Sequence, residues 1–296
     1  MKSRKRRART RSPWPPVGRL IRRVVRESLE HDIFGLAAQM AFYFLLAIFP
    51  FMLLLFTLIP YFVDPSAAGK LRALVAPVLP PRAWEQVWIN IDNLLLEKRE
   101  GLLSFGAVVT LWSASNGFAA IIQGLNAAYE VPEARPFWRQ RLVAIGMTVG
   151  LGILMLISIV LLVFGEALGN LIDRYTSFPL FIWITIRWSA ALLFMVLVLD
   201  IIYYAAPNVR HRWRSFSPGA LLATPLWVAA SVGFTWYVGR FGSYELTYGT
   251  LAALISLMLW FYVSSIVLLL GGELNAVLER VAGEVTRAVP TVTSDK

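Results

Sequence analysis

The chain has 296 residues, of which 57% are hydrophobic and only 16% are charged, and its mean hydropathy is +0.62. This composition excludes an ordinary soluble domain and predicts an all-α, polytopic membrane protein. The chain has no cysteine and two histidines, which argues against disulfides, thiolate chemistry and histidine-rich metal sites. We therefore expect no catalytic residue, no metal ion, no cofactor and no enzyme activity.

The net charge of +10 is concentrated in the N-terminal region and in short loops. Residues 1–16 are expected to form a disordered basic arm, for which RNA binding is less favoured than a cytoplasmic topology signal touching anionic lipid. From Val17 the apolar residues follow a helical repeat, and Arg19, Arg22, Arg23 and Arg26 occupy the other face. This pattern predicts an interfacial helix whose basic face lies against anionic lipid headgroups.

Six apolar segments are long enough to cross a bilayer as helices. They lie at about residues 33–62, 102–129, 142–164, 181–206, 218–238 and 249–273. Residues 64–100 are too long for a plain loop and carry an amphipathic stripe, which predicts an extracytoplasmic helical cap between spans one and two. The expected fold is thus a six-transmembrane-helix bundle over residues 17–279, followed by a cytoplasmic tail at 280–296.

Six spans place both termini on one side of the membrane. Of the 28 Lys and Arg residues, 20 lie in the two terminal regions and in the loops after spans two and four. Because Lys and Arg favour the cytoplasmic side, both termini are predicted to be cytoplasmic.

Polar side chains interrupt several of these apolar spans. In span one, Gln39 and Tyr43 share a face with Pro50, which fits a cavity lining and a packed helix with one hydrogen bond equally well. Span two carries three carboxamides on one face, those of Asn116, Gln123 and Asn126. Such groups need partners in hydrocarbon, which argues that this face points into the bundle or a wet cavity.

The last span ends in Gly271-Gly272-Glu273-Leu274-Asn275, and Tyr262 shares a helical face with Glu273. Our hypothesis is that polar residues of several spans converge on one cavity, open to the cytoplasmic side near Asn126 and Glu273, where substrate headgroups or protons are handled. The substrate path would comprise Gln39, Tyr43, Asn116, Gln123, Asn126, Asp200, Tyr262, Glu273 and Asn275. Predicted kinks or hinges are Pro50, Pro225, Gly271 and Gly272. The alternative is that Glu273 and Asn275 only cap the helix end and pair with Arg141 or Arg214.

Several ordered motifs resemble the YihY/BrkB family of bacterial inner-membrane proteins. They are Ala41-Phe42-Tyr43-Phe44 to Pro50, Ser113-Ala114-Ser115-Asn116-Gly117 to Tyr129, Pro218-Gly219-Ala220, Tyr248-Gly249-Thr250 and Gly272-Glu273-Leu274-Asn275. Ala47 departs from the family, in which a serine often precedes the Phe-Pro pair. The resemblance implies a multi-pass protein of the bacterial inner membrane.

The family has carried ribonuclease and virulence labels, and some members are linked to export of lipopolysaccharide precursors. A ribonuclease role is not expected here, because the sequence shows no metal-ligand cluster and no soluble domain to hold RNA. The similarity to exporters implies movement of a lipid or other amphipathic molecule across or within the membrane. A non-transporting scaffold or envelope-integrity factor is the alternative. We expect no nucleic-acid partner, and the oligomeric state is not specified by the sequence.

Overall fold

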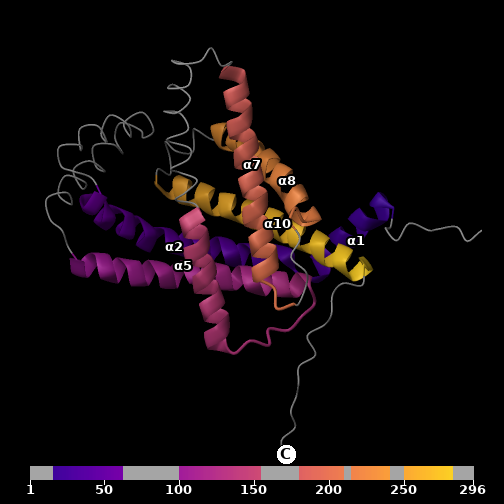
Figure 1. Cartoon of the computed structure of the whole chain (residues 1–296), viewed down its shortest axis with the longest axis horizontal. Helices are drawn as coiled ribbons and strands as arrows, with labels where there is room; N and C mark the ends of the chain where they lie inside the picture. The colour runs from indigo at the N-terminus through magenta and orange to yellow at the C-terminus, as the bar shows by residue number, and fades with distance from the viewer. Residues whose placement is uncertain (1–15, 63–99, 155–179, 210–214, 241–249, 283–296) are drawn as a thin grey trace, which may run out of the picture.

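The computed structural model describes residues 16–62, 100–154, 180–209, 215–240 and 250–282. All regular secondary structure in these ranges is α-helical. The labelled helices are α1 (Val17–Glu30), α2 (Ile33–Phe62), α5 (Glu100–Ala128), α7 (Leu180–Ala205), α8 (Pro218–Arg240) and α10 (Thr250–Ala282), and residues 137–154 form one more helix (Figure 1).

Five of the described helices, α2, α5, α7, α8 and α10, are long and apolar enough to cross a membrane. The all-α, polytopic prediction is therefore confirmed. The predicted span at 142–164 is helical as far as residue 154, and its remainder lies outside the described residues. The predicted cap at 64–100 lies outside them too, apart from Glu100 at the start of α5, and so do nearly all of the arm at 1–16 and most of the tail at 280–296.

The helix α10 differs most from its prediction. It continues without interruption through Gly271 and Gly272 to Ala282, so the first three residues of the predicted tail are helical. Gly271 lies where α10 meets α7 and α8, and a Cβ atom there would overlap the Tyr203 hydroxyl. The glycine pair therefore fits close helix packing instead of a helix end. Pro50 and Pro225 also lie within helices, α2 and α8, and hinge roles for these four residues stay predictions.

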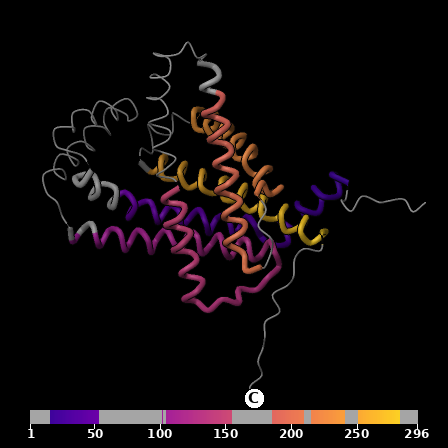
Figure 2. Tube along the Cα trace, in the orientation of Figure 1, coloured from indigo at the N-terminus to yellow at the C-terminus, as the bar shows by residue number. Residues whose placement is uncertain are grey.

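The core forms where α2, α5 and α10 pack together. α2 lies alongside α5, while α10 contacts α2 on one side and α8 on another (Figure 2). Small side chains such as Ala37 and Ala120 and larger ones such as Met40, Leu125 and Leu269 fill this core. The helix α1 rests on one end of α10, and the hydroxyl of Tyr203 on α7 donates a hydrogen bond of 2.8 Å to the Leu268 carbonyl of α10.

Candidate functional site

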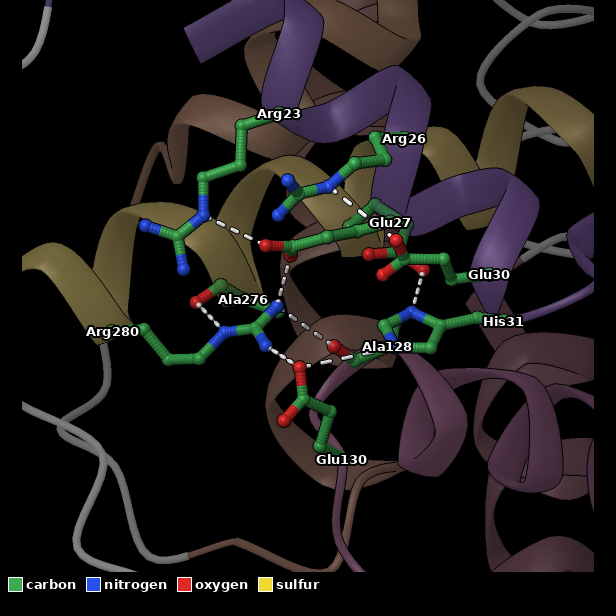
Figure 3. Close-up of polar contacts among 10 residues, drawn as sticks. Arg23, Arg26, Glu27, Glu30, His31, Ala128, Glu130, Ala276 and Arg280 are labelled. Atoms are coloured by element: carbon green, nitrogen blue, oxygen red, sulfur yellow. Dashed lines mark hydrogen bonds and ion pairs between the residues drawn. The ribbon is translucent and has the colours of Figure 1, made fainter. Parts of the chain in front are cut away.

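Charged side chains gather at one end of the helix bundle, where α1, the turn after α5 and the last turns of α10 meet (Figure 3). We call Glu27, His31, Glu130, Glu273 and Arg280 the end network. Arg280 donates to Glu27 Oε2 at 2.5 Å through Nη2 and to Glu130 Oε1 through Nη1. Because Glu27 is on α1, Glu130 follows α5 and Arg280 is on α10, this one guanidinium joins three elements.

Glu273 is the most buried member of the end network, with 0% of its surface exposed. Its Oε1 lies 2.7 Å from Nδ1 of His31, which caps the C-terminal end of α1. Its Oε2 is buried and has no hydrogen-bond partner among the described residues. A buried carboxylate oxygen normally has a partner, so this oxygen marks Glu273 as a candidate functional group.

Of the alternative for Glu273, the helix cap and the pairing with Arg141 are wrong, and the pairing with Arg214 stays a prediction. Glu273 lies inside α10, more than two turns before its end, so it does not cap the helix. Its partner is His31, whereas Arg141 donates from Nη1 to Asn116 Oδ1 at 2.7 Å. Arg214 lies outside the described residues.

Two predicted path residues hold the first turn of α8. The carboxylate of Asp200 accepts hydrogen bonds from the backbone N–H groups of Phe216 at 2.7 Å and Ser217 at 3.0 Å. Asn275 accepts from the Gly219 N–H at 2.7 Å and donates to the Ser217 hydroxyl at 3.1 Å. These N–H groups lie at a helix start, where they lack partners within the helix. Asp200 and Asn275 thus attach α8 to α7 and α10.

Asn126 connects the two loops that follow α5 and α7. Its Nδ2 donates to Glu133 Oε2 at 2.9 Å, and its Oδ1 accepts from the Asn208 N–H at 2.7 Å. Glu133 also accepts two side-chain hydrogen bonds from Arg135, whose Nη2 donates to the Ala206 carbonyl. Desolvation opposes ionisation of Glu133, but the hydrogen bonds and charge of Arg135 outweigh it and lower the pKa of Glu133.

The remaining carboxamides are Asn116 and Gln123 on α5 and Gln39 on α2. With Arg141 they form a group that we call the α5 polar line. Gln39 Nε2 lies 3.4 Å from Gln123 Oε1, and Gln123 is exposed. Arg141 lies in the 137–154 helix, with its guanidinium carbon 3.8 Å from the ring centroid of Trp112. Asn116 is twelve residues from the end of α5, about 18 Å along the helix axis.

Tyr43 and Tyr262 are half-buried and pack against the apolar core. Neither belongs to the end network or the α5 polar line. The structure therefore distributes the nine predicted path residues over several places along the bundle, and a single shared cavity stays a prediction.

An open hollow of about 390 Å³ lies between α8 and α10, and none of the nine predicted residues lines it. Its lining residues are Ser231, Phe234, Thr235, Val238, Ser256, Leu257 and Trp260. The hydroxyls of Ser231 and Thr235 donate to backbone carbonyls one turn earlier in α8, so their polarity is largely satisfied within the helix. The hollow thus presents a mainly apolar surface.

Sequence reasoning missed four of the five members of the end network: Glu27, His31, Glu130 and Arg280. His31 and Glu273 are 242 positions apart, and no sequence spacing signals such a contact. A weak signal existed for Glu27, because an acidic residue one turn after Arg23 interrupts an otherwise basic helix face.

Comparison with known proteins gives one matching family and two similar relatives. A sequence model of the family described as "Virulence factor BrkB" matches residues 24–294. The chain is 37% identical over 253 residues to the putative ribonuclease-like protein YfkH of Bacillus subtilis (strain 168), covering 84% of this chain and 91% of that protein. It is 28% identical over 282 residues to a UPF0761 membrane protein of Pseudoalteromonas atlantica, covering 91% and 89%. No solved structure matches the chain.

Proposed function

Because the chain belongs to the BrkB virulence-factor family and is similar to UPF0761 membrane proteins, we propose that it moves a lipid or other amphipathic molecule across or within the bacterial inner membrane. The observation that carries this proposal is the α5 polar line. Three carboxamides and a guanidinium lie along helices that are otherwise apolar, and Gln123 is exposed. A polar group facing hydrocarbon is costly, so a face of this kind suits a passage for headgroups.

Arg141 gives this passage a charge preference. Its guanidinium is held by Asn116 and by the Trp112 carbonyl, and it stacks on the Trp112 ring. Arginine binds phosphate and carboxylate groups through paired N–H donors. We infer that the headgroup is anionic, while the mainly apolar hollow between α8 and α10 offers a surface for an acyl chain.

The proposed orientation places the end network and both termini on the cytoplasmic side. In support, the end network lies where the C-terminal end of α1 meets the last turns of α10. On α1 the side chains of Val17, Ile21, Val25 and Leu29 are all exposed, at 51–72% of their surfaces, beside exposed arginines. This arrangement suits a helix lying in the headgroup region of a leaflet rich in anionic lipids.

The competing functions make different demands on the structure. A scaffold would bind its partners through apolar faces and would not need polar groups along α5. The Bacillus relative is named ribonuclease-like. We do not propose RNA cleavage for this chain, because its sequence has no cysteine and no histidine-rich site that could carry out the cleavage. We propose that the chain is not an enzyme.

The test is a lipid-movement assay on purified protein in liposomes. An anionic phospholipid with a fluorescent headgroup is placed in both leaflets, and a membrane-impermeant quencher is added outside. Movement exposes the inner-leaflet label, so quenching proceeds beyond the level of empty liposomes. We expect Arg141→Gln to slow the quenching of the inner-leaflet label about tenfold or more. The reason is that a charge-assisted contact with the headgroup contributes about 1.5–3 kcal/mol of binding free energy.

Arg139→Gln is the matched control. Arg139 also stacks on a tryptophan, 4.9 Å from the Trp138 ring centroid, but it is exposed and outside the α5 polar line. The Arg139→Gln protein should move lipid at the wild-type rate. Quenching by the wild type that stops at the level of empty liposomes, for anionic and zwitterionic lipids alike, would contradict the proposed function.

A further inference from the structure

A line of titratable side chains connects the buried carboxylate of Glu273 with the protein surface. Glu273 Oε1 lies 2.7 Å from His31 Nδ1, and the other ring nitrogen, Nε2, lies 3.8 Å from Glu130 Oε1. The exposed fraction of the side chains rises along this line, from 0% for Glu273 to 15% for His31 and 47% for Glu130. An imidazole between two carboxylates can accept a proton on one nitrogen while it releases one from the other.

The second oxygen of Glu273 indicates what this line serves. Oε2 is buried without a hydrogen-bond partner among the described residues. A carboxylate with an unsatisfied buried oxygen is costly, and a bound proton removes its charge. Glu273 is therefore placed to bind and release a proton inside the membrane domain.

We propose that His31 passes protons between the surface at Glu130 and a proton-binding site at Glu273. A proton from Glu130 or from water bonds to Nε2 of the neutral ring and gives an imidazolium. The Nδ1–H bond then breaks, its proton bonds to Glu273 Oε1, and the ring is left neutral with its proton on Nε2. The reverse steps return the proton to the surface. The 3.8 Å separation of Nε2 and Glu130 is crossed through a water molecule or after a small rotation of the Glu130 side chain.

The neighbouring charged groups fix this geometry. On α1, Glu27 is bound by Arg23 and by Arg280, and Arg280 also holds Glu130 from α10. The next acid along α10, Glu279, accepts a hydrogen bond from Tyr129 at 3.2 Å. On α7, Asp200 is bound to the start of α8, and the described sequence of α2 contains no charged residue. Among the described residues, His31 is thus the group in contact with Glu273 that can carry a proton to it.

The proposal goes beyond lipid movement and does not require it. Its test follows the protonation of Glu273 directly, by infrared spectroscopy of the purified full-length protein after a rapid pH change. The carboxylic-acid C=O band that disappears in Glu273→Gln is assigned to Glu273. We expect His31→Gln to slow the appearance of that band at least about tenfold, a typical effect of removing a positioned proton-transfer group. Glu130→Gln should slow it less, because water also reaches His31.

Two controls separate proton transfer from a structural role. His211→Gln removes the one other histidine of the chain and should leave the rate unchanged. In His31→Ala, added imidazole should restore the rate, which would not occur if His31 only held α1 in place. The proposal is overturned if no band is lost in Glu273→Gln, or if the band appears equally fast in the wild type and in His31→Gln. Failure of imidazole rescue in a folded His31→Ala protein would also overturn it.

Discussion

The polar residues of the membrane helices are of two kinds. Asp200, Asn126 and Asn275 each make two or more hydrogen bonds to loops or helix ends, and these contacts explain their presence in apolar segments. Gln123 is exposed, and Glu273 keeps a buried oxygen without a partner among the described residues. Residues of the second kind are the better candidates for function, because structural contacts alone do not offset the free-energy cost of placing these polar groups in a membrane.

Glu133 should contribute a pH-dependent part of the stability. Its pKa is lowered in the folded protein, so its stabilising effect is present above the ordinary pKa of 4.5 and is lost as the pH falls through the lower folded value. We expect Glu133→Gln to lower the free energy of unfolding by about 1 kcal/mol at neutral pH, since the site is partly exposed.

Thermal unfolding in detergent at neutral pH and well below pH 4.5 measures this difference. The gap between wild type and Glu133→Gln should close at the acidic pH. Glu30→Gln serves as the control, because Glu30 is 60% exposed and pairs with Arg26 on its own helix at 3.4 Å. An equal gap at both pH values would show that the charge of Glu133 does not stabilise the fold.

Among the elements, α8 and α10 approach closely at Gly219, and this contact depends on glycine. A Cβ atom at Gly219 would overlap the Gly271 carbonyl oxygen and lie 2.7 Å from the Asn275 side-chain amide, whereas a Cβ atom at Gly233 would meet nothing within 4 Å. Both glycines belong to α8. They therefore give a matched pair for testing the packing.

We expect Gly219→Ala to destabilise the protein by about 1–3 kcal/mol, because the helices must separate. Gly233→Ala should be neutral or stabilising by up to about 1 kcal/mol, since alanine favours the helix. Chemical or thermal unfolding of the two variants in the same detergent makes the comparison. Equal stabilities would mean that α8 and α10 are not in close contact at Gly219.

Hydropathy predicted the five described helices that are long and apolar enough to cross a membrane, because a bilayer-spanning helix needs a long apolar run whatever its neighbours are. The predicted last span ends at residue 273, whereas α10 continues to Ala282, because the glycine pair packs closely against neighbouring helices without ending the helix. The carboxamides of α5 were found from helical phase. The contacts of Glu273 with His31 and of Arg280 with Glu27 were not, because they join residues more than 240 positions apart.

For the whole molecule, the distribution of polarity relates the structure to the proposed function. Large apolar side chains cover the described helices, among them Val108, Trp188 and Val232, each 67% exposed, as expected for surfaces facing lipid tails. The end network concentrates charge at one end of the bundle, and the α5 polar line runs from near that end toward the middle of α5. As a passage for headgroups, this line must face water or headgroups instead of acyl chains.

The most direct test of that requirement is the water accessibility of single cysteines introduced into this cysteine-free chain. Asn116→Cys lies on the α5 polar line about 18 Å from the end of α5, and Val108→Cys lies on an exposed apolar part of the same helix. With the protein in native-like membranes, a charged, membrane-impermeant thiol reagent should modify Asn116→Cys and leave Val108→Cys unmodified. If the two cysteines are equally unreactive from both sides of the membrane, α5 faces hydrocarbon at both positions, and the proposed headgroup passage does not exist.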